Sequence, residues 1–106
     1  MFYHVVLIQF HPGVDDDFLC NAETYAQRVR NECDGVVAYF FAPNTAARAD
    51  GFSHAVVGIY DSAEAHEAYQ VSPVHQEMKE FLLTRIKRIV AFDADRDDEN
   101  ITQTPA

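Results

Sequence analysis

The segment FYHVVLIQF, residues 2–10, has apolar side chains at both odd and even positions. Successive side chains of a strand point to opposite faces, so a strand of this kind must be covered on both faces. The segments VVAYFFA (36–42) and FSHAVVGIY (52–60) repeat the pattern and are rich in β-branched and aromatic residues. The chain therefore has to build a sheet that is buried on both sides.

Helical patterns separate these strands. Residues 16–33 carry apolar side chains at helical spacing, which predicts an amphipathic helix. Residues 61–69 begin with a capping-box pattern led by Asp61 and form a second helical segment. The helix restarts at Ser72, an N-cap residue that is followed by proline, and residues 86–93 fit a fourth strand.

The order β-α-β-β-α-β predicts an α+β fold, a ferredoxin-like sandwich in which helices cover one face of a four-stranded antiparallel sheet. The other face would then expose an apolar patch, which is unusual on a monomer. We therefore expect two copies to pair through their sheet faces as a homodimer, forming a dimeric α/β barrel. Residues 1–95 form this domain, and residues 96–106 are predicted to be an acidic, flexible C-terminal tail.

Acidic residues outnumber basic ones by 17 to 8, which gives a formal net charge of −9. Such a chain repels phosphate groups, so neither nucleic acid nor an anionic membrane is an expected partner. No stretch reaches the roughly 18 apolar residues that span a bilayer, and no signal-peptide pattern is present. We expect a soluble, cytoplasmic protein.

His4 is the polar exception in the first strand. Burying an imidazole without a partner costs about 1–3 kcal/mol, so His4 needs a structural partner or a pocket. It shares a strand face with Val6 and Ile8, while His54 shares one with Val56. These five residues are candidates for lining an apolar substrate pocket with few polar groups. Purely structural contacts are the alternative for both histidines.

Three segments carry a resemblance to a known family, namely YHVVLIQFHPGV, GFSHAVVGIYDSAEAHEAYQVSPVHQEM and IVAFD. Together they resemble the stress-responsive dimeric A/B barrel (Dabb) domain, over nearly the whole predicted domain. The resemblance implies the ferredoxin-like fold and the homodimer. It implies mixed functions as well, since some members are stress-induced proteins without assigned chemistry. A plant member closes a linear polyketide by an aldol condensation without a cofactor.

Matched residue by residue to that plant cyclase, the resemblance implies Tyr69 and His75 as an acid/base pair and His4 as a cavity residue. His54 matches the histidine of the third strand, with a weaker implication for function. One position departs from the family pattern, because the first residue of the turn before His75 is Ser72 instead of histidine.

The residue types and positions of His75 and Tyr69 also suit acid/base catalysis, without reference to the family. His75 is the third residue of a helix that Pro73 opens, where the positive helix end disfavours a protonated imidazole. A neutral His75 could remove a proton next to a carbonyl group while the Tyr69 hydroxyl stabilises the developing negative oxygen. The alternative is a helix-terminal histidine and a tyrosine at the core rim. His11 and His66 are predicted to be solvent-exposed, without a role.

The chain has neither a His-x-x-x-His nor a Cys-x-x-Cys spacing, so we expect no metal site and no cofactor. The predicted function is that of a stress-responsive barrel protein that binds a small apolar carbonyl-type molecule. It could act as a cofactor-free acid/base catalyst of the polyketide cyclase, aldol or isomerase type. The alternatives are a non-catalytic stress-response protein that acts through stable dimer assembly, and a cofactor-free monooxygenase.

Overall fold

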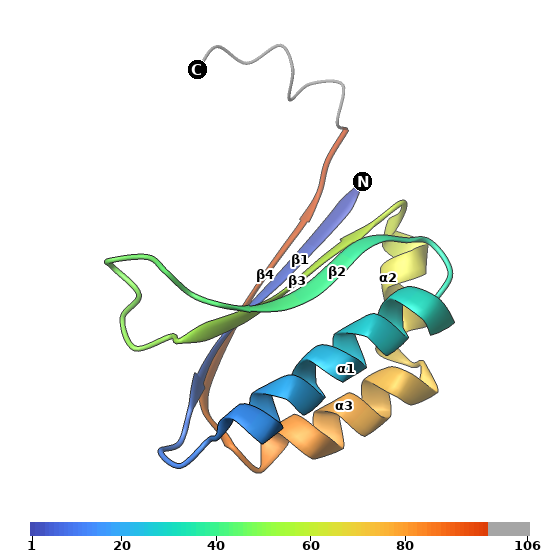
Figure 1. The fold of residues 1–106 in the computed structure, drawn as a ribbon. Helices are drawn as coiled ribbons and strands as arrows, with labels where there is room; N and C mark the ends of the chain where they lie inside the picture. The colour runs from blue at the N-terminus through green and yellow to red at the C-terminus, as the bar shows by residue number, and fades with distance from the viewer. Residues whose placement is uncertain (98–106) are drawn as a thin grey trace.

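The computed structural model describes residues 1–97 and contains a four-stranded sheet with its helices on one face (Figure 1). The elements follow in the order β1 (Phe2–Phe10), α1 (Asp16–Glu32), β2 (Val36–Pro43), β3 (His54–Tyr60), α2 (Ala63–Gln70), α3 (Pro73–Leu83) and β4 (Ile86–Asp95). Neighbouring strands are antiparallel, in the order β2-β3-β1-β4. The predicted ferredoxin-like α+β sandwich is confirmed.

The cap of α2 differs from the predicted one. The Ser62 hydroxyl accepts a hydrogen bond from the Ala65 amide at 3.1 Å and begins the helix. Asp61 lies one residue earlier in the turn, where its amide donates to the Gly35 carbonyl at 2.9 Å. The cap of α3 is Ser72, as predicted.

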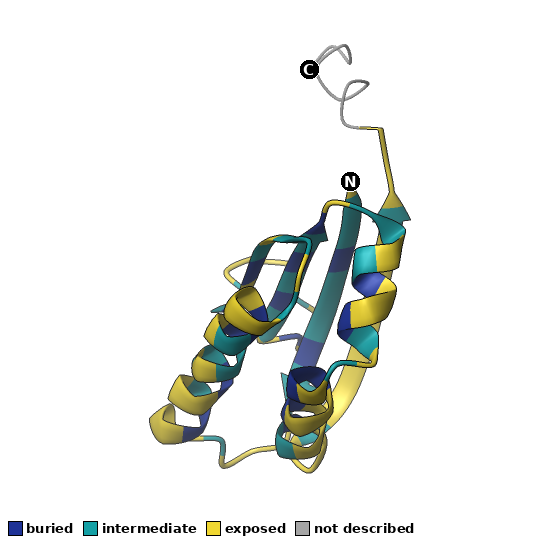
Figure 2. Cartoon of the chain, turned by 90° about the vertical axis from the view of Figure 1, so that its right-hand side faces the viewer, coloured by how far each residue is buried: buried dark blue, intermediate teal, exposed yellow. Residues whose placement is uncertain are grey.

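The core lies between the helices and one sheet face, and exposed residues predominate on the outer sides of the helices (Figure 2). Three fully buried tyrosines meet within it, Tyr39 from β2, Tyr60 from β3 and Tyr69 from α2. The ring centroids of Tyr39 and Tyr60 each lie 5.4 Å from that of Tyr69. This tyrosine cluster brings phenol hydroxyls into the core beside α3.

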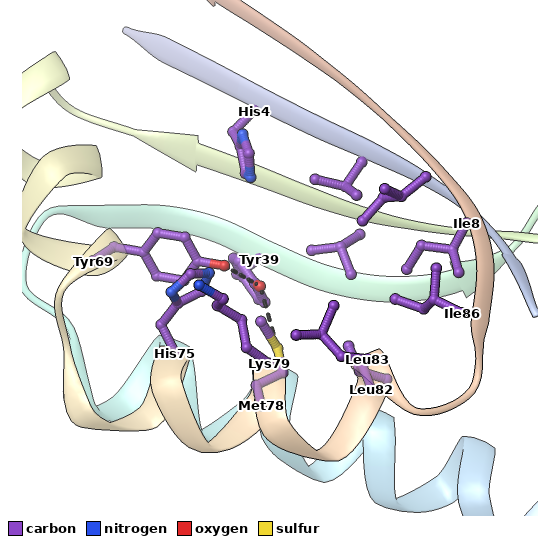
Figure 3. Close-up of a pocket in the computed structure, with 13 residues that line it drawn as sticks. His4, Ile8, Tyr39, Tyr69, His75, Met78, Lys79, Leu82, Leu83 and Ile86 are labelled. Atoms are coloured by element: carbon purple, nitrogen blue, oxygen red, sulfur yellow. Dashed lines mark hydrogen bonds between the residues drawn. The ribbon is translucent and has the colours of Figure 1, made fainter.

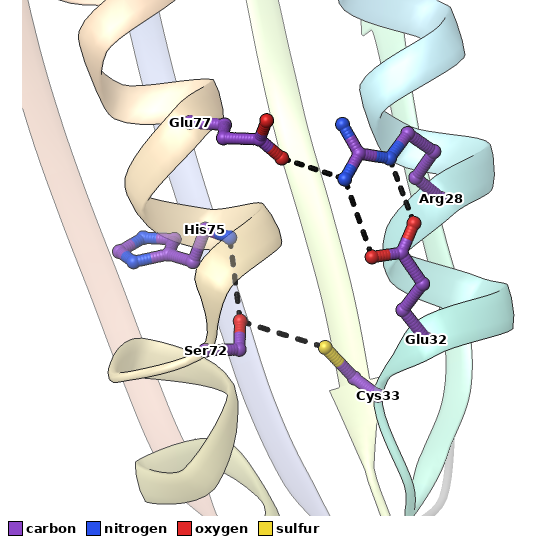
Figure 4. Close-up of polar contacts among 6 residues, drawn as sticks. All are labelled: Arg28, Glu32, Cys33, Ser72, His75 and Glu77. Carbon is purple, nitrogen blue, oxygen red and sulfur yellow. Dashed lines mark hydrogen bonds and ion pairs between the residues drawn. The ribbon is translucent and has the colours of Figure 1, made fainter.

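Arg28 connects α1 to α3 at the surface. Its guanidinium donates to Glu32 in the same helix at 2.7 Å and to Glu77 of α3 at 2.6 Å (Figure 4). All three side chains are more than a third exposed, so the network contributes little to the free energy of unfolding. Its main effect is on the relative placement of the two helices.

The sheet face away from the helices, here called the open sheet face, is apolar in every strand. The strand register places Phe40, Val57, Val5 and Phe92 next to one another in one row across the sheet. In the single chain Phe40 is 43% exposed and Phe92 is 60% exposed. The two-faced strand pattern therefore leaves an apolar surface for a partner.

β4 continues to Asp95, two residues beyond the predicted end of the last strand. Backbone pairing extends to Arg96, whose amide donates to the Met1 carbonyl at 2.9 Å. Most of the predicted tail, residues 98–106, lies outside the described residues. Within residues 1–97, no helix is long and apolar enough to cross a membrane.

Candidate functional site

A pocket lies between α3 and the helix-facing side of the sheet (Figure 3). Six of the seven predicted site residues line it, namely His4, Val6, Ile8, Val56, Tyr69 and His75. The other walls are mostly apolar and comprise Tyr39, Met78, Leu82, Leu83, Ile86, Ile89 and one charged residue, Lys79. The volume is about 90 Å³. A cavity of roughly 150 Å³ holds benzene, so this pocket suits a small molecule or one end of a larger one.

His75 is fixed in the first turn of α3. Its amide donates to the Ser72 hydroxyl at 3.3 Å (Figure 4). Its Nδ1 atom lies 2.9 Å from the carbonyl oxygen of Gln70. A carbonyl oxygen can only accept a hydrogen bond, so Nδ1 bears the proton and Nε2 keeps its lone pair in the neutral ring.

The pKa of His75 is held below the usual 6.5. Burial is the main cause, and the Lys79 cation acts in the same direction, while the hydrogen bond to Gln70 opposes both. The predicted cause, the positive helix end, acts in the same direction as burial. His75 is therefore neutral near pH 7, with Nε2 available as a base.

Tyr69 faces His75, with 4.6 Å between the ring centroids. The Tyr69 hydroxyl lies 2.6 Å from that of Tyr39, and both hydroxyls point into the pocket region (Figure 3). Burial raises the pKa of Tyr69 to about 12, although its hydrogen bond with Tyr39 acts in the opposite direction. Burial raises the pKa of Tyr39 further still. Tyr69 is therefore the more acidic phenol of this pair, and it remains protonated near pH 7.

His4 of β1 is paired with Asp93 of β4. The two residues are opposite one another in the β1–β4 register, and His4 Nδ1 lies 2.5 Å from the Asp93 carboxylate. The ring projects from the strand toward Tyr69 (Figure 3), with 6.2 Å between centroids. His4 thus has a hydrogen-bond partner in Asp93 and also lies in the pocket wall.

His66 is buried, and the prediction that it is solvent-exposed is wrong. It is 8% exposed, because the face of α2 that carries Tyr69 also turns His66 toward the sheet. Its ring stacks on Phe2 at 4.4 Å and lies 4.7 Å from His4. With His4 and Asp93 it forms the one group of side chains in residues 1–97 that is spaced to hold a metal ion.

His54 does not line the pocket, unlike Val56 two residues later. It begins β3, where its ring stacks on Phe41 at 5.2 Å and its Nδ1 lies 2.8 Å from the Ser53 hydroxyl. Burial lowers its pKa. These contacts match the structural alternative for His54, and its position gives no support to a pocket role.

Three residues of the site were not among the sequence candidates. Asp93 lies 89 residues from His4 in the sequence, and the β1–β4 pairing brings the two together. Lys79 follows His75 by one helical turn, a spacing that puts both on one helix face. Tyr39 lies in a predicted strand, and a buried phenol there needs a hydrogen-bond partner.

Comparison with known proteins assigns the chain to a family. The stress responsive A/B barrel domain (Dabb) matches residues 2–95. The chain therefore belongs to this family. A comparison with curated proteins gives no match.

Solved structures share the fold over most of the chain. At3g17210 from Arabidopsis thaliana is 22% identical, with a TM-score of 0.79, and the match covers 92% of this chain and 96% of that chain. A dimeric ferredoxin-like protein from Thermobifida fusca is 20% identical, with a TM-score of 0.77 and 90% of each chain covered. A hydroxynitrile lyase from Passiflora edulis is 16% identical, with a TM-score of 0.79 and coverage of 92% and 94%. At these identities the similarity shows the fold alone.

Proposed function

We propose that this A/B barrel protein binds a small carbonyl compound in the pocket and transfers a proton next to its carbonyl group without a cofactor. The observation that carries the proposal is the placement of His75. It is a neutral base with a free Nε2, and its ring lies 4.6 Å from that of Tyr69 in the lining of the same pocket. The apolar walls suit an apolar substrate and limit access of water.

The proposed step begins at the carbon next to the carbonyl group. His75 Nε2 takes a proton from this carbon, and the electron pair of the broken C–H bond forms an enolate. Tyr69 donates a hydrogen bond to the enolate oxygen. The Tyr39 hydroxyl lies 2.6 Å behind it, and when Tyr39 donates to the Tyr69 oxygen instead of to Met78 Sδ, the Tyr69 proton is left for the substrate.

The enolate can then react in one of two ways beside His75 and Tyr69. When the enolate is conjugated with a C=C bond, the His75 imidazolium can return its proton to the far end of the conjugated system, which moves the double bond and gives an isomer. The enolate carbon can instead attack a second carbonyl carbon of the same molecule, and the resulting alkoxide then takes the proton, which gives a cyclic aldol. His4, held by Asp93 on the sheet side of the pocket, would orient the substrate.

Carbon–carbon bond cleavage is the reverse of the aldol step, and one structural neighbour is named a hydroxynitrile lyase. That name supports a lyase as one form of the proposal, but a shared fold hosts many chemistries. The volume of about 90 Å³ favours a second candidate, a non-catalytic stress-response protein whose main property is stable dimer assembly. Ligand-sized pockets usually measure about 300 Å³ or more.

The same proposal includes a homodimer that forms through the open sheet face. The apolar row from Phe40 to Phe92 crosses all four strands, and burying such a surface contributes about 25 cal/mol per Å². The Thermobifida fusca neighbour is described as dimeric, which supports this assembly.

Deuterium exchange tests the catalytic proposal without knowledge of the natural substrate. Acetone and propanal are incubated with the protein in D₂O, and loss of the α-proton signal is followed by NMR against a buffer control. We expect exchange above the buffer rate, reduced at least about 100-fold in His75→Gln. Tyr60→Phe is the matched control, because Tyr60 belongs to the tyrosine cluster but does not line the pocket.

Exchange at the buffer rate with both compounds, together with the absence of binding to the pocket, would favour the non-catalytic candidate. Oxygen uptake in place of exchange would favour a cofactor-free monooxygenase.

A further inference from the structure

A cluster of three polar side chains lies beside the pocket, where β1, α2 and β4 meet. His4, His66 and Asp93 offer two imidazole nitrogens and one carboxylate oxygen, and these atoms all lie within 4.8 Å of one another. Each residue comes from a different element, so the cluster exists only in the folded chain.

Both histidines are buried, His4 with 6% and His66 with 8% of its surface exposed. One nitrogen of each imidazole ring already makes a hydrogen bond. Nδ1 of His4 is bonded to Asp93, and Nε2 of His66 lies 3.0 Å from the side-chain amide of Gln70. The second nitrogen of each ring makes no hydrogen bond within residues 1–97 and is not fully enclosed, so both nitrogens are open to a ligand.

The surroundings of the cluster hold the ligand atoms in place. Phe2 stacks on His66 at 4.4 Å, and the side-chain amide nitrogen of Gln70 lies 3.0 Å from His66 Nε2. Metal-binding histidines usually donate their other ring N–H to an acceptor, and the Gln70 side chain can supply one when its amide group turns its oxygen toward His66. The Asp93 side chain is 45% exposed, so an ion can enter from solvent and the carboxylate can move to make room for it.

We propose that His4, His66 and Asp93 form a binding site for a divalent transition metal ion, and that zinc is the ion this ligand set fits best. Zinc binds imidazole nitrogen and carboxylate oxygen at about 2.0–2.2 Å, with a tetrahedral arrangement that leaves a fourth position for water. Tetrahedral ligands at that distance lie about 3.4 Å apart. The three ligand atoms lie within 4.8 Å of one another, so the tetrahedral spacing requires side-chain movement, and the half-exposed Asp93 side chain has the most room to move.

The zinc site does not rest on the proposed proton transfer, because neither His75 nor Tyr69 supplies a ligand. The two proposals share His4, which lines the pocket and also belongs to the cluster. It revises the expectation that the chain has no metal site. That expectation came from the absence of local spacings such as His-x-x-x-His, whereas these ligands lie on three separate elements.

Metal titration of the tag-free protein tests the site. The protein is treated with a chelator, dialysed, and titrated with Co²⁺ by visible absorption and with Zn²⁺ by calorimetry. We expect one Co²⁺ per chain with the absorption of a four-coordinate site, displaced by one equivalent of Zn²⁺. His66→Phe keeps an aromatic ring on Phe2 but removes a ligand, and should weaken both affinities at least tenfold. Asp93→Ala should do the same.

His11→Gln is the matched control, because it removes an exposed histidine outside the cluster and should bind both ions like the wild type. Two results would overturn the proposal. One is wild-type protein that takes up no stoichiometric metal at micromolar concentration. The other is metal binding by Asp93→Ala that is as tight as that of the control. Because the Asp93 side chain is half exposed, this second result decides the question even if His66→Phe does not fold.

Discussion

The Nδ1 atom of His75 lies 2.9 Å from the carbonyl oxygen of Gln70, the last residue of α2. This contact joins the end of α2 to the first turn of α3 across the break at Ser72. It also determines which nitrogen of His75 bears the proton. The same break allows Tyr69 and His75 to face each other although they belong to different helices.

Replacing Lys79, the cation near His75, should shift the pH at which the rate of proton transfer declines. Burial and Lys79 hold the pKa of His75 below 6.5, so exchange in the wild type should decline only below that pH. Lys79→Glu favours the imidazolium and should move this decline to higher pH. The pH profile of the exchange rate measures the shift. Lys87→Glu makes the same charge change at an exposed β4 position, and an equal shift there would contradict a local effect.

Protonation of His75 should destabilise the fold. Its pKa is lower in the folded state, so the unfolded chain binds the proton more readily and stability falls as pH drops through 6.5. His75→Gln cannot take up this proton. Urea unfolding at about pH 7.5 and about pH 5.5 should therefore show the wild type losing stability relative to the variant at the lower pH. A stability difference that does not depend on pH would argue against the buried, neutral imidazole.

Two neighbouring tyrosines should respond differently to loss of the hydroxyl. Tyr69→Phe removes the donor in the pocket and should slow exchange by about 10- to 1000-fold. The Tyr60 hydroxyl is buried and has no hydrogen-bond partner among the described residues. A buried unpaired hydroxyl costs about 1–3 kcal/mol, so Tyr60→Phe should keep exchange and match or exceed wild-type stability. An equal loss of exchange in both variants would contradict the proposed role of the Tyr69 hydroxyl as the donor to the substrate.

The architecture could be predicted from the sequence because it depends on local periodicity. Alternation of apolar residues on both faces marks strands such as residues 2–10, and helical spacing marks residues 16–33. The two-sided strands also predicted an apolar surface beyond the helix-covered core, and the structure shows it as the open sheet face. The start of α2 was missed by one residue, because Asp61 and Ser62 are both good caps and only the turn geometry separates them.

The candidate site was predictable only in part, because long-range contacts complete it. The pairing of His4 with Asp93 depends on the β1–β4 register, and no spacing within the chain encodes it. His66 was misjudged because a polar residue on a short helix resembles a surface residue, whereas α2 turns this face inward. His54 shares its strand face with Val56, but it begins the strand and so lies beyond the pocket.

A charge on the open sheet face should prevent dimerisation. Phe92→Asp places an unpaired carboxylate in the apolar row, where burial against a second copy would be strongly unfavourable. Sedimentation equilibrium should show a dimer for the wild type and a monomer for the variant. Val71→Asp makes a comparable change at a residue that is 77% exposed between α2 and α3, and should remain dimeric. A monomeric wild type, or a dimeric Phe92→Asp protein, would contradict the proposed assembly.

Replacing His4 by leucine should separate its structural role from its role in the pocket. The change removes a buried polar group and leaves no large void, and the Asp93 side chain, already 45% exposed, can be hydrated once its partner is gone. His4→Leu should therefore lose no more than about 1 kcal/mol of stability in urea unfolding. Binding of propanal, followed by NMR shifts of pocket residues, should weaken, because the polar group on the sheet side of the pocket is lost. A loss of several kcal/mol with propanal binding unchanged would mean that His4 serves the sheet through Asp93 and has no part in the pocket.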